Sequence, residues 1–105
     1  MPINPTNNQL IRDLIHDNNV YFQKIDNERE YIKTLLSKLE PTLCECGVAM
    51  AHGQKAVATI TLTKSADICS KIAISYEAIH LWRKDIKRNL EEIDKLRGAK
   101  NEKEL

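Results

Sequence analysis

The sequence predicts an all-α protein in which a long N-terminal helix pairs with a C-terminal helical region, within a single domain of 105 residues. Three observations lead to this fold class. Glycine and proline are rare, with three of each, so few positions interrupt a helix. Apolar residues recur every three or four positions over about thirty residues near the N-terminus, as in an amphipathic helix. Charged residues make up 30% of the chain but leave a net charge of only +1, which excludes a strongly basic nucleic-acid coat and still allows a local basic face.

The first helix is predicted over residues 7–40, after a flexible arm at residues 1–6. Thr6 or Asn7 is the expected N-cap, because short polar side chains accept hydrogen bonds from the first helical amides. Pro41 is the expected end, since the residue before a proline avoids helical angles. A helix of this length needs a second long helix to cover its apolar stripe, in the same chain or in another copy, so we expect a homo-oligomer. The stripe comprises Leu10, Leu14, Tyr21, Ile25, Ile32, Leu35 and Leu39.

Residues 42–62 differ in character, with small side chains and two of the three glycines. We expect short helical segments here, from about Thr42 to His52 and then up to Leu62, with a break near Gly53. The run "VATITLT" could instead form a strand, but a lone strand has no partner elsewhere in this chain. A helix is therefore favoured.

The stretch "SADICSKIAISYEAIHLWRKDIKR", residues 65–88, has two interpretations. It is either two short helices that meet at residues 73–75, or part of one continuous helix over residues 64–97. In both cases Gly98 ends the helix and residues 98–105 form a frayed tail. The apolar seam of the final part is made by Ile86, Leu90, Ile93 and Leu96.

The first interpretation meets the requirements of two helices joined by a tight turn. Cys69 is the small residue where the helices touch, Ala73 occupies the turn, and Ser75 caps the second helix. The apolar contacts would come from Ile68, Ile72, Ile74, Ile79 and Trp82. The segment "DICSKIAISYEAIHLW", residues 67–82, therefore resembles the helix-turn-helix motif of many phage and bacterial DNA-binding regulators, with Ala73 at the turn position that glycine usually fills.

This resemblance implies a small DNA-binding accessory or regulatory protein of phage or plasmid type, with double-stranded DNA as its partner. The second helix would be the recognition helix. Outward side chains near its N-terminus would reach base edges, and the basic cluster that follows would contact phosphates. The residues implied in DNA binding are Ser75, Tyr76, Glu77, His80, Arg83, Lys84, Lys87 and Arg88.

The second interpretation is a helical hairpin. Positions 68, 72, 76, 79, 83, 86, 90 and 93 keep a helical period through the supposed turn, and most of them are apolar. A second apolar stripe at Ile74, Ala78 and Leu81 would also have to be covered, which requires an oligomer or a partner. The function would then be that of a non-enzymatic helical-hairpin oligomer that binds and inhibits a partner protein or sequesters a small ligand.

The sequence gives little support for a metal site or for catalysis. Cys44, Cys46 and His52 lack the spacing and the fourth ligand of a zinc site. The histidines lie far apart in sequence, and no residue has the context of an activated nucleophile, so we expect no catalytic residues, no metal and no cofactor. Reduced cysteines, the absence of a signal peptide and the absence of a long apolar run predict a cytoplasmic protein that does not bind membranes.

Overall fold

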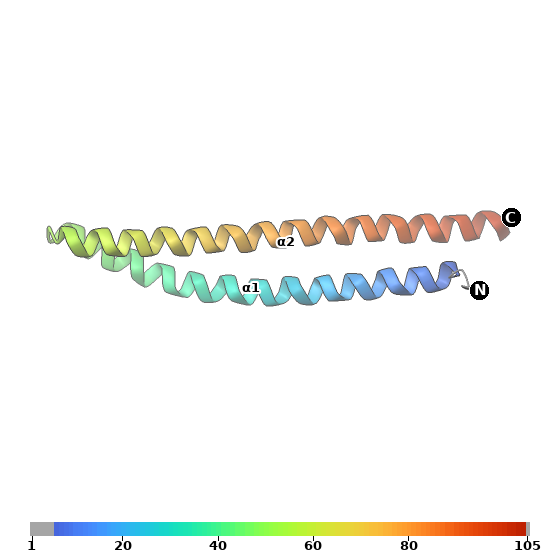
Figure 1. Ribbon diagram of the computed structural model, residues 1–105, viewed down its shortest axis with the longest axis horizontal. Coiled ribbons are helices and arrows are strands. Elements are labelled where there is room, and N and C mark those ends of the chain that lie inside the picture. Colours follow the sequence, from blue (N-terminus) through green and yellow to red (C-terminus); the bar gives the residue numbers. More distant parts are fainter. Residues whose placement is uncertain (1–5, 105) are drawn as a thin grey trace, which may run out of the picture. The chain divides into compact units, whose positions relative to one another are not determined.

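The computed structural model describes the backbone of residues 6–104 and the side chains of residues 6–98. Two long helices, α1 (Asn7–Ala51) and α2 (Lys55–Glu104), run antiparallel and pack as a hairpin (Figure 1). The predicted all-α fold class is confirmed. The chain divides into two compact units, which we describe separately: the terminal unit, Met1–Ile25 with Ile79–Leu105, and the turn unit, Asp26–Ala78.

Helix α1 begins at Asn7 because Thr6 caps it. The Gln9 amide donates to Thr6 Oγ1 at 3.2 Å, and the Leu10 amide donates to the Thr6 carbonyl at 3.0 Å. The hydroxyl satisfies an amide that has no partner inside the first turn. The predicted cap is confirmed, whereas the other residues of the predicted arm, 1–5, lie outside the described residues.

Helix α1 does not end at Pro41, so that prediction is wrong. A proline inside a helix removes one amide donor and crowds the preceding turn, which costs about 3 kcal/mol. The helix nevertheless continues past it, and in the next turn Thr42 Oγ1 donates to the Lys38 carbonyl at 2.7 Å. Pro41 is exposed, and the buried side chains of Leu35 and Cys46 on either side of it face the hairpin core. This packing outweighs the local penalty.

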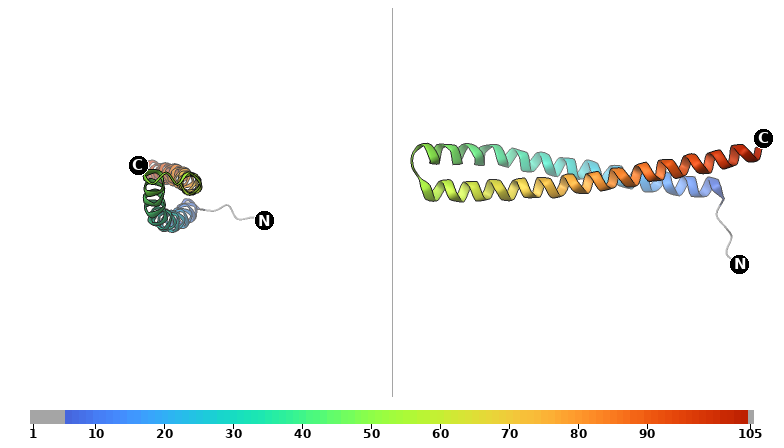
Figure 2. Two further views of the ribbon diagram at one scale, coloured as in Figure 1. Left: turned by 90° about the vertical axis from the view of Figure 1, so that its left-hand side faces the viewer. Right: turned by 90° about the horizontal axis from the view of Figure 1, so that it is seen from above.

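The chain reverses at residues 52–54, as Figure 2 shows at the closed end of the hairpin. The Gln54 amide donates to the Ala49 carbonyl at 2.8 Å and the Gly53 amide to the Met50 carbonyl at 3.2 Å. These are the two bonds of a Schellman motif, which requires a left-handed residue between them. Gly53 supplies it with a φ of +69°, which confirms the predicted break. The separate short helices predicted at 42–62 are wrong, because the two parts belong to α1 and α2.

The run "VATITLT" is helical, as predicted, despite its β-branched residues. Its hydroxyls fold back on the helix: Thr59 Oγ1 donates to the Lys55 carbonyl and Thr63 Oγ1 to the Thr59 carbonyl, both at 2.9 Å. These bonds let threonine side chains sit within a helix without competing for other partners.

Helix α2 passes through residues 73–75 without a turn, so the helix-turn-helix interpretation is wrong and the continuous helix is confirmed. No non-glycine residue of the described part has a positive φ, Ala73 included. Ser75 is not a cap but is buried in the middle of α2, 4% exposed. Alanine favours helix over the left-handed turn that the motif requires.

Gly98 does not end α2 either, because the helix runs to Glu104. The predicted helix end at Gly98 is therefore wrong. An interior glycine costs a helix only about 1 kcal/mol, and no proline follows it in the sequence. Gly98 has no positive φ, unlike Gly53.

The core of the turn unit is one seam per helix with alternating spacings of three and four residues. This is the heptad pattern of a coiled coil. Near the turn the seam residues are small, and Cys46 Sγ contacts the Ala58 carbonyl of α2 at 3.6 Å, so the two helices approach closely there. The seam comprises Glu28, Ile32, Leu35, Leu39, Thr42, Cys46 and Ala49 of α1, and Ala58, Thr61, Ser65, Ile68, Ile72 and Ser75 of α2.

The terminal unit continues the same seven-residue pattern with larger side chains. Asn89 Nδ2 donates to Asn18 Oδ1 at 2.9 Å across the two helices. The Lys24 ammonium lies 5.8 Å from the ring centroid of Tyr21 and 6.0 Å from that of Trp82, within the range of a cation–π contact. The seam comprises Ile11, Leu14, Asn18, Tyr21 and Ile25 of α1, and Ile79, Trp82, Ile86, Asn89, Ile93 and Leu96 of α2.

Over the described residues, neither helix contains a stretch that is long and apolar enough to cross a lipid bilayer.

Candidate interaction surface

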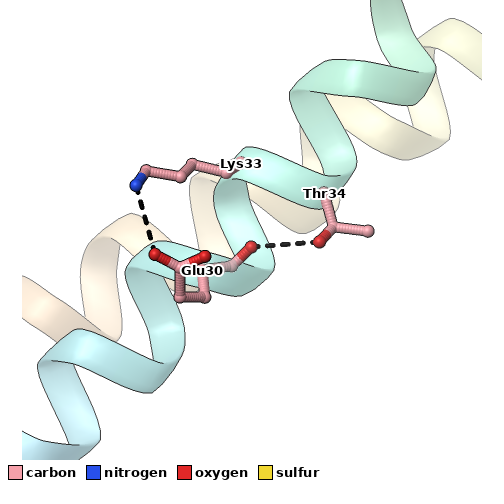
Figure 3. Close-up of polar contacts among 3 residues, drawn as sticks. All are labelled: Glu30, Lys33 and Thr34. Carbon is pink, nitrogen blue, oxygen red and sulfur yellow. Dashed lines mark hydrogen bonds and ion pairs between the residues drawn. The ribbon is translucent and has the colours of Figure 1, made fainter.

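Part of the solvent face of the turn unit is an ordinary charged helix surface. Figure 3 shows an example, in which Lys33 Nζ pairs with Glu30 Oε1 at 3.1 Å and Thr34 Oγ1 donates to the Glu30 carbonyl at 3.1 Å. Both charged side chains are 73% exposed, so the pair contributes little to stability. The charged side chains of this face remain hydrated when the face is exposed to water.

Helix α2 carries a second, uncharged stripe on its exposed side in the turn unit. Its residues follow the seam residues by one position and therefore keep the same spacings of three and four. Leu62 is 51% exposed and Tyr76 is 63% exposed, and the other members are exposed as well. We call this set the outer stripe: Thr59, Leu62, Ala66, Cys69, Ala73 and Tyr76.

The charges of this part of α2 lie away from the outer stripe. Between Ala56 and Tyr76 the charged residues are Lys64, Asp67 and Lys71, and their helical positions place them on the opposite flank of the seam. Lys71 Nζ pairs with Asp67 Oδ2 at 3.1 Å, and this hydrogen bond raises the pKa of Lys71. Lys71 and Asp67 thus satisfy each other on that flank, which also exposes Ile60 and Ile74, whereas the outer stripe carries no charge.

Helix α1 adds a row of large apolar side chains spaced seven residues apart. Leu36 and Leu43 are 49% exposed and Met50 is 59% exposed. Met50 lines an open groove of about 350 Å³ together with Thr59 and Leu62 of the outer stripe. The α1 row and the outer stripe therefore meet on one side of the turn unit, and we call their combined surface the outer face.

The outer face can bury apolar surface. On α2 the seam and the outer stripe together occupy four of every seven positions, and a helix with so wide an uncharged surface is typical of bundles, in which more than one neighbour covers each helix. The small members, Ala66 and Ala73, leave room for the backbone of another helix to approach closely. The geometry is that of a helix-packing surface without its partner.

The residues predicted to bind DNA do not all share one exposed surface in the structure. Ser75 is buried in the seam, while Tyr76 and Glu77 are exposed on the turn unit. The remaining residues belong to the terminal unit. There His80, Arg83, Lys84 and Lys87 are all exposed on the outer side of α2, and Arg88 forms an ion pair with Asp85.

The terminal unit also has a shallow pocket of about 280 Å³ in α1, lined by His16, Asp17, Val20, Tyr21 and Lys24. The pKa of Tyr21 is raised above 10.0, mainly by the negative charge of Asp85 and further by burial and by a hydrogen bond with Asp85. A nearby carboxylate disfavours the tyrosinate. The pocket is open and polar, and we assign no ligand to it.

The role predicted for Cys69, a small residue at a contact between two helices, is wrong. Cys69 is exposed and makes no helix-to-helix contact of the predicted kind, Cys44 is exposed, and Cys46 is buried in the seam. Among the described residues no group of three or more His, Cys, Asp or Glu is arranged to hold a metal ion.

Sequence reasoning missed the outer stripe and placed the second apolar stripe elsewhere. Of the residues predicted for it, Ile74 and Leu81 are exposed, but Ala78 is half-buried. A signal was present: from Pro41 to Tyr76 only five of 36 residues are charged, and none between Ala56 and Tyr76 falls on the outer stripe. A search for large apolar side chains selects Ile74. A search for positions at helical spacing that carry no charge selects the outer stripe.

Comparisons with protein-family models, with curated proteins and with solved structures find no match to this chain.

Proposed function

We propose that the protein is a non-enzymatic interaction module, a helical hairpin that binds another helical surface through its outer face. The observation that supports this most directly is the outer stripe on α2, which has seam spacing, is exposed and carries no charge. A helix that is apolar on two sides is covered on two sides in a stable assembly. The hairpin seam covers one side, and a binding partner covers the other.

Burial of the outer face is favourable because it removes apolar surface from water, while the long side chain of Lys55, which lines the groove near the turn, can keep its ammonium group hydrated. Each Å² of buried apolar area contributes about 25 cal/mol, while burial of an unpaired charge would cost several kcal/mol. The outer face contains Leu36, Leu43 and Met50 beside the outer stripe, and all three are about half exposed.

Site-specific photo-cross-linking in the cells that produce the protein tests this proposal. A photoreactive residue replaces Ala66 on the outer stripe or, as the control, Lys71 on the charged flank of the same helix. We expect a discrete covalent adduct from position 66 and none from position 71. No adduct from position 66, or equal adducts from both positions, would overturn the proposed function.

A second candidate function is binding of duplex DNA through the basic side of α2 in the terminal unit. The observation that favours it is the exposure of Arg83, Lys84 and Lys87 within little more than one helical turn, with His80 beside them. Such a cluster can neutralise phosphates without reading sequence. Arg88 is less available, because Asp85 pairs with it.

Fluorescence anisotropy of a labelled duplex at several salt concentrations tests this second function. For Arg83→Ala/Lys84→Ala/Lys87→Ala we expect weaker binding than wild type and a salt slope reduced by about 0.9 for each lost phosphate contact. The control, Lys38→Ala/Lys55→Ala/Lys64→Ala, removes the same charge from the turn unit and should retain the wild-type slope. Absence of binding by the wild type at low salt would reject this function.

A further inference from the structure

The outer face is two helices wide, which bears on the kind of partner that covers it. The groove near the turn is lined by α1 residues such as Met50 and by α2 residues such as Leu62, so both helices contribute to the same surface. One helix is about 10 Å in diameter with its side chains. A single added helix would cover the groove but leave much of the flanking apolar surface in water.

We infer that a second copy of this chain covers the outer face, so that two hairpins form a four-helix bundle. This inference rests on the proposed function and names the partner. The two faces would meet around a two-fold axis, which is the commonest symmetry of homodimers. Each helix would then have two neighbours, as its two apolar sides require.

The sizes of the side chains on the outer face are complementary to each other. The α1 row is large, with Leu36, Leu43 and Met50, whereas the outer stripe of α2 includes the small residues Ala66 and Ala73. Two-fold packing can set the α1 row of one copy against the α2 stripe of the other, which brings large side chains onto small ones. Interdigitation of this kind gives well-packed helix interfaces.

The charges at the edge of the outer face permit this self-association. On α1 the residues that flank the row in the turn unit are Asp26, Arg29, Lys33 and Glu40, two acidic and two basic. A surface of one sign would repel its own copy. The α1 edge has no net charge, so an identical surface can approach it, and Lys55 of α2, which lines the groove, adds one positive charge near the turn.

The outer face is long enough for a helix-packing interface, because all six residues of the outer stripe, from Thr59 to Tyr76, are exposed. Residues 59–76 alone extend over about 27 Å of helix, so two helices of that length offer a face of sufficient extent.

Sedimentation equilibrium of the full chain from micromolar to millimolar concentration tests the inference. We expect the wild type to reach twice the chain mass of 12.1 kDa, and Ala66→Glu/Ala73→Glu to remain at the monomer mass. The matched control, Ile60→Glu/Ile74→Glu, introduces the same charge on the same helix away from the outer stripe, and it should still dimerise. A wild type that stays monomeric, or a control that dissociates while Ala66→Glu/Ala73→Glu dimerises, would overturn the inference.

A cross-linking measurement on the wild-type background covers the case in which the glutamate variant fails to fold. Unlabelled chain that carries a photoreactive residue at position 66 is mixed with ¹⁵N-labelled wild-type chain. After irradiation the cross-linked peptides are identified by mass spectrometry. We expect cross-links from position 66 to labelled peptides of α1 that contain Leu36, Leu43 or Met50. Absence of labelled adducts contradicts the second copy. An adduct in cells to a different protein would retain the proposed function and reject only this inference.

Discussion

Asn18 and Asn89 show how single polar residues contribute to the terminal unit. Their side chains are hydrogen bonded across the two helices at 2.9 Å, and Asn18 is 4% exposed. Asn89→Ala removes the donor and leaves the buried Asn18 amide without this partner. We expect the free energy of unfolding to fall by about 1–3 kcal/mol, the cost of an unsatisfied buried polar group, in urea unfolding followed by circular dichroism.

The double variant Asn18→Leu/Asn89→Leu distinguishes a hydrogen-bond penalty from a loss of packing. Replacing both partners by apolar groups is often neutral or stabilising, so we expect it to be at least as stable as the wild type. A paired asparagine in a seam usually fixes register at some expense of stability. A double variant less stable than Asn89→Ala would contradict this account.

Tyr21 provides a prediction about pH. Asp85 raises the pKa of Tyr21 above 10.0, so the folded state holds the phenolic proton more tightly than the unfolded state does. Its contribution to stability is complete below about pH 10 and is lost as the pH rises through the folded pKa. In a Tyr31→Phe/Tyr76→Phe background, tyrosinate absorbance should therefore appear above pH 10, and Asp85→Asn should lower the midpoint. Asp94→Asn, the charge-matched control, should leave it in place.

At the scale of the elements, Gly53 is the residue on which the hairpin turn depends. Its φ of +69° lies in the left-handed region, where a Cβ costs about 1–2 kcal/mol. Gly53→Ala should therefore destabilise the protein by about that amount in thermal or urea unfolding. Gly47→Ala is the matched control, since Gly47 lies within α1 and a Cβ there meets nothing within 4 Å. It should stabilise by about 0.5–1 kcal/mol, and equal losses in both variants would refute the role of φ.

The helix ends show which local signals can be trusted in a sequence. Thr6 and Gly53 were predicted correctly, because each supplies a bond or a backbone angle that a helix end needs. Pro41 and Gly98 were predicted to stop helices and do not. Each only weakens a helix by about 1–3 kcal/mol, and seam packing over many turns outweighs that. Local residue preferences therefore predicted the turn but not the length of the helices.

The same competition explains the two interpretations of residues 65–88. Ser75 has the chemistry of a cap, yet it occupies a seam position between Ile72 and Ile79 and is buried. A cap contributes about 1 kcal/mol, which is less than the burial of the apolar seam residues beside it. Periodicity was the better guide to the fold. The candidate site could not be predicted from apolar content, because half of the outer stripe consists of Thr59, Ala66 and Ala73, which are small residues.

At the scale of the whole molecule, the core of the hairpin is thin, and the proposed dimer would add to it. The described residues include 15 large hydrophobic side chains that are exposed and none that is completely buried. A chain that gains part of its burial from a second copy is stabilised by mass action. Its apparent stability must then depend on protein concentration.

Thermal unfolding at several concentrations measures this dependence. For a dimer, each tenfold increase in concentration adds about 1.4 kcal/mol, which for two chains of this length corresponds to about 3 °C in the midpoint. We expect the wild type and Ile60→Glu/Ile74→Glu to show this shift. A dimer of Ala66→Glu/Ala73→Glu would bring four carboxylates together, two from each copy, so we expect this variant to remain monomeric. Its unfolding midpoint should therefore be lower than that of the wild type and should not change with concentration. A wild-type midpoint independent of concentration would mean that each hairpin is stable alone, and its exposed outer face would then be free for a different protein.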